Sequence, residues 1–120
     1  ELLRYHGLTN LARRVVKDIE IGSVTIPAGD MVLMPLTIHG LDERAYPDPM
    51  TVDFNRAGKP NMIFGSGPHF CLGNRLARIE LRLLLTEWLA RIPDFAVDPD
   101  GSVDAVSNGT NMVRSLPLIW

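Results

Sequence analysis

The chain has 120 residues, of which 46% are apolar and 22% charged, and its formal net charge is −2. This composition suits one soluble globular domain at most and gives no electrostatic reason to expect nucleic acid or a membrane as a partner. The single cysteine excludes an internal disulfide and favours the reducing cytoplasm, where we expect a monomer. The opening ELLR lacks both a methionine and a helix cap, so we expect the C-terminal part of a longer chain.

The first half of the sequence predicts a helix end, a strand meander and a long irregular segment. Residues 1–6 are typical of the last turns of a helix, and residues 8–16 form a connector with a basic pair. Apolar and polar residues alternate around glycine-containing turns, which predicts short antiparallel strands over residues 14–36. Residues 39–63 are rich in proline and polar residues. A loop of about 20 residues inside a domain is uncommon and usually functional.

The second half predicts one long helix followed by strands. Apolar residues recur at helical spacing over residues 74–91, and the pattern begins two positions earlier. We expect this helix to be largely buried, because it carries two adjacent apolar stripes. The stripes are Leu72, Leu76, Ile79 and Leu83, and Ala77, Leu81, Leu84 and Trp88. Residues 94–120 alternate turn signals with short apolar pieces, which predicts terminal strands or hairpins.

The glycine-rich turn FGSGPHFCLG, residues 64–73, carries the only cysteine and precedes the long helix. The amides and dipole at a helix N-terminus favour a thiolate, and glycines permit close approach of a flat partner. On these residues alone, four roles stay open for Cys71: an inert buried residue, a nucleophile with His69 as its base, a zinc ligand, or the thiolate ligand of a haem iron. Zinc would need about four ligands, whereas the chain has one cysteine and three scattered histidines.

The pattern F-x-x-G-x-x-x-C-x-G is met by Phe64, Gly67, Cys71 and Gly73. It resembles the cysteine loop of the cytochrome P450 superfamily. The resemblance implies the C-terminal portion of that fold, which is mainly α with small antiparallel β-sheets.

Three charged residues extend the resemblance over essentially the whole chain. Glu1 and Arg4 resemble the family's E-x-x-R helix motif, and Arg56 in VDFNR resembles the arginine that completes a Glu-Arg-Arg cluster. We expect this cluster to be structural rather than catalytic. The stretches ELLRY, GLDERAYPDPMTVDFNR, EWLARIPDF and LPLIW are most similar to the bacterial camphor hydroxylase group of soluble enzymes.

The resemblance also implies roles for residues around the cysteine. Cys71 would be the axial ligand of the iron of haem b. His69 and Arg13 would bind the haem propionates by charge-assisted hydrogen bonds, with Arg14 the competing choice. Further cofactor contacts would come from Phe64, Gly65, Leu72 and Gly73. Segments that border the substrate pocket in the family correspond to Leu8, Thr9, Leu11, Gly109 and Thr110.

The activity implied by the resemblance is monooxygenation, in which O2, two electrons and two protons convert an apolar R–H into R–OH and water. The implied substrate is small and terpenoid-like. The implied electron donor is an acidic [2Fe-2S] ferredoxin, which could dock on the basic stripe Arg75, Arg78 and Arg82. The oxygen-activating distal residues lie outside this chain, so we do not expect the fragment alone to be active. Two alternatives stay open: a haem-thiolate electron-transfer or gas-sensing protein without oxygenase activity, and a haem-free domain with an inert cysteine.

Overall fold

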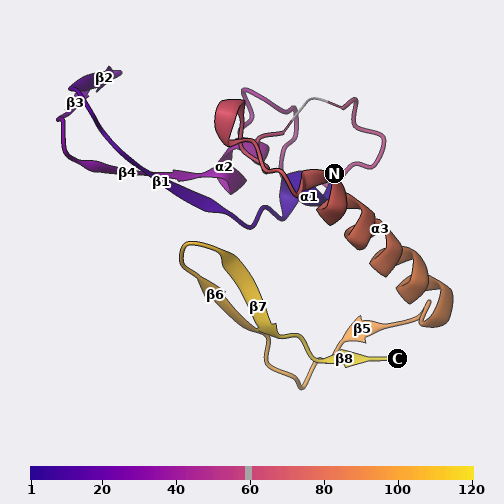
Figure 1. Ribbon diagram of the computed structural model, residues 1–120. Coiled ribbons are helices and arrows are strands. Elements are labelled where there is room, and N and C mark those ends of the chain that lie inside the picture. Colours follow the sequence, from indigo (N-terminus) through magenta and orange to yellow (C-terminus); the bar gives the residue numbers. More distant parts are fainter. Residues whose placement is uncertain (59–60) are drawn as a thin grey trace. The chain divides into compact units, whose positions relative to one another are not determined.

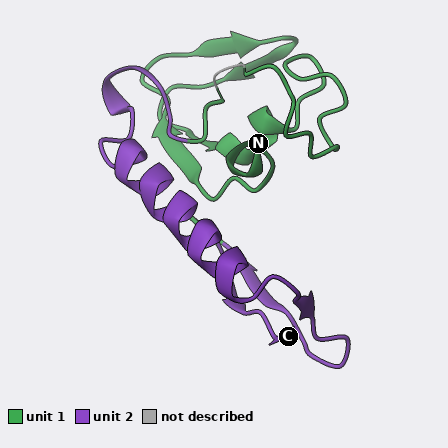
Figure 2. Ribbon diagram, turned by 90° about the vertical axis from the view of Figure 1, so that its right-hand side faces the viewer, with its two compact units in different colours: residues 1–63, 108–111 green, residues 64–107, 112–120 purple. Residues whose placement is uncertain are grey.

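The computed structural model describes residues 1–58 and 61–120. Lys59 and Pro60, which fall in the predicted irregular segment, lie outside the described residues. The chain divides into two compact units, shown in green and purple in Figure 2. Unit 1 comprises residues 1–63 and 108–111, and unit 2 comprises residues 64–107 and 112–120.

Unit 1 contains two short helices and two small antiparallel sheets (Figure 1). Strand β1 pairs with β4 from Asn10 opposite Pro35 to Arg14 opposite Met31, and β2 pairs with β3 between them in sequence. Gly22 and Gly29 occupy the turns after β2 and β3 with φ values of 62° and 98°, a region that glycine enters without a steric penalty. The elements are α1 (Leu2–Tyr5), β1 (Asn10–Arg14), β2 (Ile19–Ile21), β3 (Val24–Ile26), β4 (Met31–Pro35) and α2 (Leu36–Gly40).

Among the described residues, the core of unit 1 is small and includes a charged side chain. Its buried apolar side chains are Val15, Tyr46 and Ile63, and the Arg4 side chain is buried with them at 3% exposure. Gly7 is also buried, and a Cβ atom there would press against the side chains of Ile63 and Thr37. The absence of a side chain at this position therefore lets the end of α1 approach α2.

Unit 2 contains one long helix and two pairs of strands. Strand β5 pairs with β8 in antiparallel orientation, and β6 pairs with β7. The last turn of the long helix packs its Trp88 ring edge-on against Phe95 and Trp120, with ring centroids 5.7 and 6.3 Å apart. The elements are η1 (Gly67–His69), α3 (Asn74–Arg91), β5 (Ala96–Val97), β6 (Asp104–Ser107), β7 (Asn111–Ser115) and β8 (Leu118–Ile119).

The secondary structure differs from the sequence predictions at three points. Strand β1 occupies residues that we interpreted as a connector, because its partner β4 and not its own pattern makes it a strand. Helix α2 is one short turn that the sequence did not indicate. Helices and strands contribute about equal numbers of described residues, so the prediction of a mainly α fold is not confirmed for this portion.

The prediction that the long helix is largely buried is wrong for the described residues. No residue of α3 is buried, and Leu76 and Leu84 are 60% and 59% exposed. In unit 2, the described ring contacts of the helix are those of Trp88 near its end and of Arg78 with Phe64 near its beginning. The apolar stripes indicate which faces of the helix favour burial, but unit 2 supplies few side chains to cover them. Among the described residues, no helix has the length and apolarity that a membrane span requires.

Candidate functional site

The cysteine loop, residues 64–73, is held closed by backbone hydrogen bonds. The Cys71 N–H donates to the Phe64 carbonyl oxygen at 2.9 Å, and the Phe70 N–H donates to that of Gly67 at 3.0 Å. Gly65 and Gly67 have φ values of 76° and 61°, which side chains at these positions would disfavour. The loop thus folds back on itself and presents Cys71, a free and exposed thiol, just before α3.

Asn74 fixes the other side of the cysteine. It is the first residue of α3, and both its backbone N–H and its side-chain Nδ2 donate to the Cys71 carbonyl oxygen, at 3.3 and 2.7 Å. Gly73 lies beside the thiol, since a Cβ atom there would be 3.8 Å from Cys71 Sγ. The N–H groups of Leu72 and Gly73 have no backbone acceptor among the described residues. The N–H and carbonyl groups of Cys71 are therefore anchored by hydrogen bonds, whereas the N–H groups of the next two residues are placed to donate to another acceptor.

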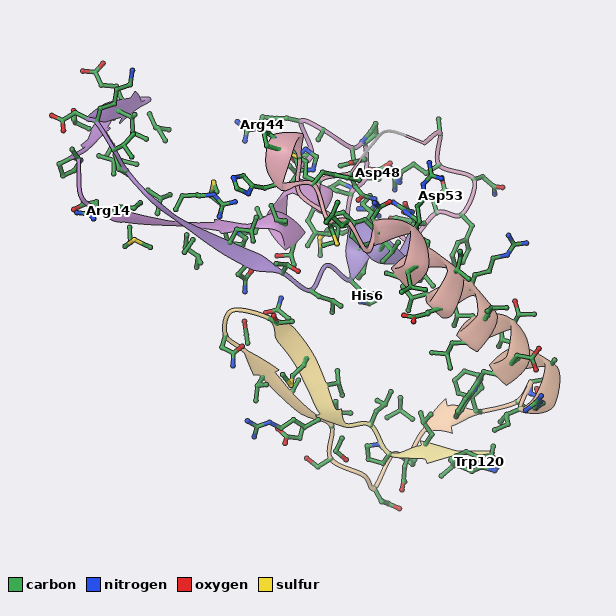
Figure 3. All side chains as sticks on the ribbon, in the orientation of Figure 1. His6, Arg14, Arg44, Asp48, Asp53 and Trp120 are labelled. Atoms are coloured by element: carbon green, nitrogen blue, oxygen red, sulfur yellow. The ribbon has the colours of Figure 1, made fainter. Side chains whose placement is uncertain are left out.

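The ion-pair cluster is formed by Glu1, Arg4 and Arg56 in unit 1. Glu1 Oε1 lies 2.6 Å from Arg4 Nη2 and 3.1 Å from Arg56 Nε. The three side chains are 9%, 3% and 14% exposed, respectively. The Asp53 N–H also donates to Glu1 Oε1 at 3.1 Å, and Figure 3 labels this residue and Asp48 on the irregular segment. The arrangement joins α1 to that segment through one carboxylate.

The two arginines of this cluster also donate to backbone carbonyls of the irregular segment, whose described residues form no strand. Arg4 donates to the carbonyl oxygens of Gly40, Pro49 and Thr51. Arg56 donates to those of Pro47, Asp48 and Thr51. A guanidinium group carries five donors in a fixed plane, so it can replace the hydrogen bonds that proline-rich backbone cannot form with itself. Through these hydrogen bonds the cluster connects several turns of the irregular segment.

The charges of the cluster shift its protonation equilibria. The hydrogen bond from Arg4, followed by those from the Asp53 backbone and Arg56, holds the pKa of Glu1 well below its usual range, against the opposing effect of desolvation. The same carboxylate raises the pKa of Arg4. Glu1 is therefore ionised whenever the cluster is intact at neutral pH.

The two segments expected to border a substrate pocket lie side by side in unit 1. Thr9 and Thr110 form an antiparallel bridge, flanked by a hydrogen bond from the Asn111 N–H to the Leu8 carbonyl oxygen at 2.7 Å. The Asn10 N–H donates to the Gly109 carbonyl oxygen at 3.2 Å. Opposed residues of such a bridge point to the same face, so the structure brings these two predicted segments together.

Asn10 adds a side-chain link between the same two segments. Its Nδ2 donates to the Asn108 carbonyl oxygen at 2.8 Å and to Asn111 Oδ1 at 3.3 Å. Residues about 100 positions apart in the sequence are thereby joined through one amide. The sequence offered no signal for this link, because asparagine is common in loops of many kinds.

Arg13 lies on β1 and is exposed, with Nη1 donating to the Ala12 carbonyl oxygen at 2.8 Å. Successive residues of a strand point to opposite faces, so Arg13 shares a face with Leu11, whereas Arg14 points to the other face. His69 is exposed at the end of η1 in unit 2. The two predicted propionate partners thus belong to different units.

The basic stripe, Arg75, Arg78 and Arg82, lies on α3, and all three residues are exposed. At about 100° per residue, the three positions fall within roughly 60° of the helix circumference. The acidic residues of α3, Glu80 and Glu87, lie about 120° or more away on the same geometry. Among the described residues, no arginine of the stripe forms an ion pair.

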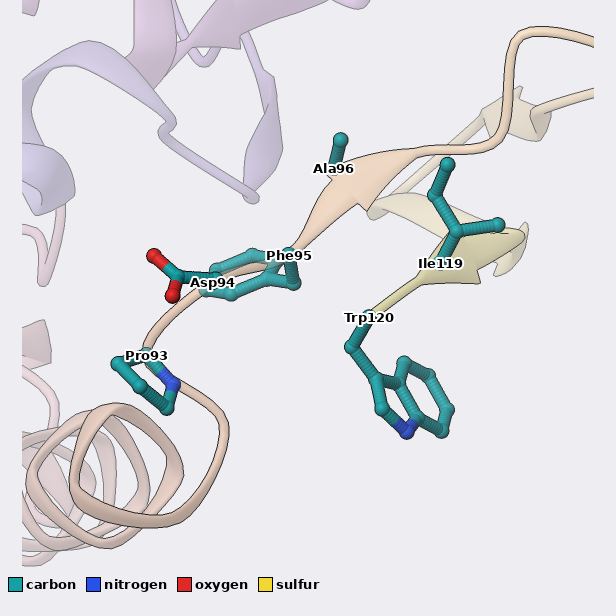
Figure 4. Close-up of a pocket in the computed structure, with 6 residues that line it drawn as sticks. All are labelled: Pro93, Asp94, Phe95, Ala96, Ile119 and Trp120. Atoms are coloured by element: carbon teal, nitrogen blue, oxygen red, sulfur yellow. The ribbon is translucent and has the colours of Figure 1, made fainter.

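A hollow in unit 2 lies apart from the residues that we predicted as functional. Trp120 and Ile119 face the residues that follow α3 across it, as Figure 4 shows. The Trp88 ring contacts the rings of Phe95 and Trp120, which line this hollow. Its buried Nε1 has no hydrogen-bond partner in the described part of the chain. The lining residues are Pro93, Asp94, Phe95, Ala96, Ile119 and Trp120. Among the described residues, no group of three or more His, Cys, Asp or Glu side chains is placed to hold a metal ion.

Comparison with known proteins identifies the family. The family model described as cytochrome P450 matches residues 1–117. The chain therefore belongs to the cytochrome P450 family, as its cysteine loop and E-x-x-R motif predicted.

Individual relatives agree with this assignment. The chain is 42% identical over its whole length to the probable cytochrome P450 127A1 of Sinorhizobium fredii, and 38% identical to the cytochrome P450 monooxygenase PikC of Streptomyces venezuelae. It covers 29% and 30% of these two proteins. Among solved structures, cytochrome P450 CYP101C1 superposes with a TM-score of 0.91 at 36% identity, over 99% of this chain and 31% of that one. The chain thus spans about three tenths of the length of these relatives.

Sequence reasoning missed two side-chain contacts of the cysteine loop, one made by Asn74 and one by Arg78, which was predicted only as part of the basic stripe. The capping pattern of asparagine does not indicate the Asn74 contact, because the N-cap of α3 is Gly73 and the Asn74 side chain donates to the Cys71 carbonyl oxygen. Arg78 lies with its Cζ atom 5.0 Å from the centre of the Phe64 ring. This contact bridges a loop and a helix, and no local sequence pattern indicates it.

Proposed function

We propose that the intact protein is a haem-thiolate monooxygenase that hydroxylates a small apolar substrate. The observation that carries this proposal is the presentation of the single cysteine, exposed and anchored on both sides, directly before α3. Membership of the cytochrome P450 family over residues 1–117 supports it. The relative PikC is itself named a monooxygenase.

The cysteine loop suits the ligand set that haem requires. In haem-thiolate proteins a single cysteine holds the iron, and Cys71 is the only thiol of the chain. Gly73 leaves space next to Cys71 Sγ that a larger residue would fill, which fits the approach of a flat macrocycle. The donor set of one exposed thiol with neighbouring free amides therefore fits haem b better than a metal ion with several protein ligands.

Residues of this chain would hold the group and tune its ligand. The Leu72 and Gly73 N–H groups would donate to the thiolate and moderate its charge, and Phe64 and Gly65 would line the proximal side. His69 and Arg13 would hold the propionates through charge-assisted hydrogen bonds. When bound, the haem would supply the iron chemistry by which O2, two electrons and two protons convert R–H into R–OH and water.

The paired segments of unit 1 support a substrate-binding role for one face of β1. Thr9, Leu11 and Arg13 alternate along the chain, and alternate residues of an extended segment share a face. A propionate-binding arginine and substrate contacts would then project together, with Thr110 opposite Thr9. The terpenoid-like character of the substrate rests on the likeness to the camphor hydroxylase group.

A ligand screen with the intact protein tests the proposed function. Small apolar ligands are expected to displace water from the iron and to produce a type I spectral shift. The best of them should be hydroxylated with O2 when a complete electron supply is present. A thiolate-type carbonyl spectrum without any oxygenated product would indicate the electron-transfer or gas-sensing alternative. A protein that binds no haem would contradict the proposal.

We further propose that an acidic [2Fe-2S] ferredoxin docks on the basic stripe. Arg82→Glu is expected to lower the second-order rate constant for reduction by such a ferredoxin about tenfold at low ionic strength and to flatten its salt dependence. Stopped-flow reduction at several salt concentrations measures both effects. Arg91→Glu is the matched control, because Arg91 pairs with Glu87 on another face of α3. Equal slowing by both variants would contradict docking at the stripe.

A further inference from the structure

One arginine of the basic stripe contacts the cysteine loop itself. The Cζ atom of Arg78 lies 5.0 Å from the centre of the Phe64 ring, within the distance at which an aromatic face attracts a cation. Arg78 belongs to the second turn of α3, and Phe64 is the first residue of the loop. Both lie in unit 2. The contact therefore links the beginning of the loop to the helix that follows its end.

Phe64 is held from two directions. Its ring lies under the Arg78 guanidinium, and its carbonyl oxygen accepts the Cys71 N–H at 2.9 Å. The backbone between them is intrinsically permissive, because Gly65 and Gly67 occupy the left-handed region. The position of the Phe64 carbonyl, and with it the orientation of the Cys71 peptide, thus depends on what fixes the Phe64 ring.

The other two arginines of the stripe differ from Arg78. Among the described residues, Arg75 and Arg82 form no ring contact and no ion pair. All three are exposed, so a surface role explains Arg75 and Arg82 fully. Such a role does not account for the contact of Arg78 with the Phe64 ring.

We propose that Arg78 is a positioning residue for Cys71 that acts through Phe64. The inference rests on the proposed function, in which Cys71 is the ligand of the haem iron. The guanidinium holds the ring, the ring fixes the carbonyl that accepts the Cys71 N–H, and this hydrogen bond orients the thiolate. This positioning role of Arg78 requires no redox partner, so it can be tested separately from ferredoxin docking on the basic stripe.

The test uses the intact protein, reduced chemically in the presence of carbon monoxide without a ferredoxin. Arg78→Gln is expected to lose the thiolate-type carbonyl spectrum about two- to fivefold faster than the wild type in mild denaturant. Its iron reduction potential should also shift. Arg75→Gln, one turn earlier on the same stripe, should leave both quantities unchanged. Arg78→Lys should restore part of the effect, because an ammonium group also binds an aromatic face.

A double-mutant cycle identifies the contact that carries the effect. In a Phe64→Leu background, Arg78→Gln should produce no further change, because the ring is already absent. Equal effects of Arg78→Gln in both backgrounds, or of Arg75→Gln and Arg78→Gln, would overturn the inference. A wild-type protein without a thiolate-type spectrum would instead refute the proposed function, whatever the Arg78 variants show.

Discussion

Replacing Cys71 by serine is expected to abolish the thiolate-type carbonyl spectrum of the reduced intact protein. The chain has no second cysteine that could take over as the ligand. A serine oxygen does not supply the electron density of a thiolate, so monooxygenation should fall to background, a loss we put at about 1,000-fold or more, given a ligand that takes part in O–O cleavage. Carbonyl difference spectra and product formation measure the two losses.

A matched control distinguishes loss of the iron ligand from a general disturbance of the cysteine loop. Ser66→Ala changes an exposed residue of the same loop for which the described residues show no side-chain hydrogen bond, and it should keep the spectrum. Alkylation gives an independent reading: the Cys71 thiol, exposed in this chain, should resist a thiol reagent in the haem-loaded protein and react after haem removal. A thiolate-type spectrum in Cys71→Ser would exclude Cys71 as the ligand.

Arg56→Leu is expected to lower the free energy of unfolding by about 3 kcal/mol, near the lower end for breaking a buried ion pair. The lower end applies because Arg56 is 14% exposed and Glu1 keeps Arg4 as a partner. The substitution also leaves the carbonyl oxygens of Pro47, Asp48 and Thr51 without this donor. The free energy of unfolding of Arg56→Lys should lie between those of the wild type and Arg56→Leu, since a lysine keeps the charge but not the planar guanidinium group. Urea unfolding of the intact protein measures the difference, and a wild-type stability for Arg56→Leu would show that the cluster is dispensable.

The same cluster predicts a dependence of stability on acid. The pKa of Glu1 is lower in the folded protein than its ordinary value of 4.5, chiefly because of the Arg4 hydrogen bond. Its stabilising effect is therefore complete above about pH 4.5 and is lost as the pH falls towards the folded pKa. Glu1→Gln should be less stable than the wild type at neutral pH, and the difference should shrink below about pH 4. A difference that stays constant with pH would contradict this assignment of the charge.

Much of the site could be predicted because its chemistry lies in short sequence patterns. The spacing from Phe64 to Gly73 indicated the cysteine loop, and the amphipathic run that follows indicated α3 (Asn74–Arg91). The E-x-x-R spacing places Glu1 and Arg4 within one helical turn, where i and i+3 side chains meet. In these cases the information lies within a few residues, so local geometry is sufficient.

What could not be predicted depends on partners that are distant in the sequence. Strand β1 (Asn10–Arg14) exists because β4 pairs with it. The Arg78–Phe64 contact depends on how the loop returns to the helix, which residue spacing does not specify. The apolar stripes of α3 gave the faces that favour burial, but burial requires other elements to cover them. Propensity and periodicity describe one segment at a time, whereas these features belong to pairs of segments.

The link between Asn10 and the segment 108–111 has a consequence for synthesis. Unit 1 is otherwise built from residues 1–63, yet its last hydrogen bonds come from residues made about a hundred positions later. At about 5–20 residues per second, a ribosome adds those residues roughly 5–20 s after Asn10. During that interval the Leu8 carbonyl and the Asn10 amide lack these hydrogen-bond partners, so we expect this edge of the unit to form last.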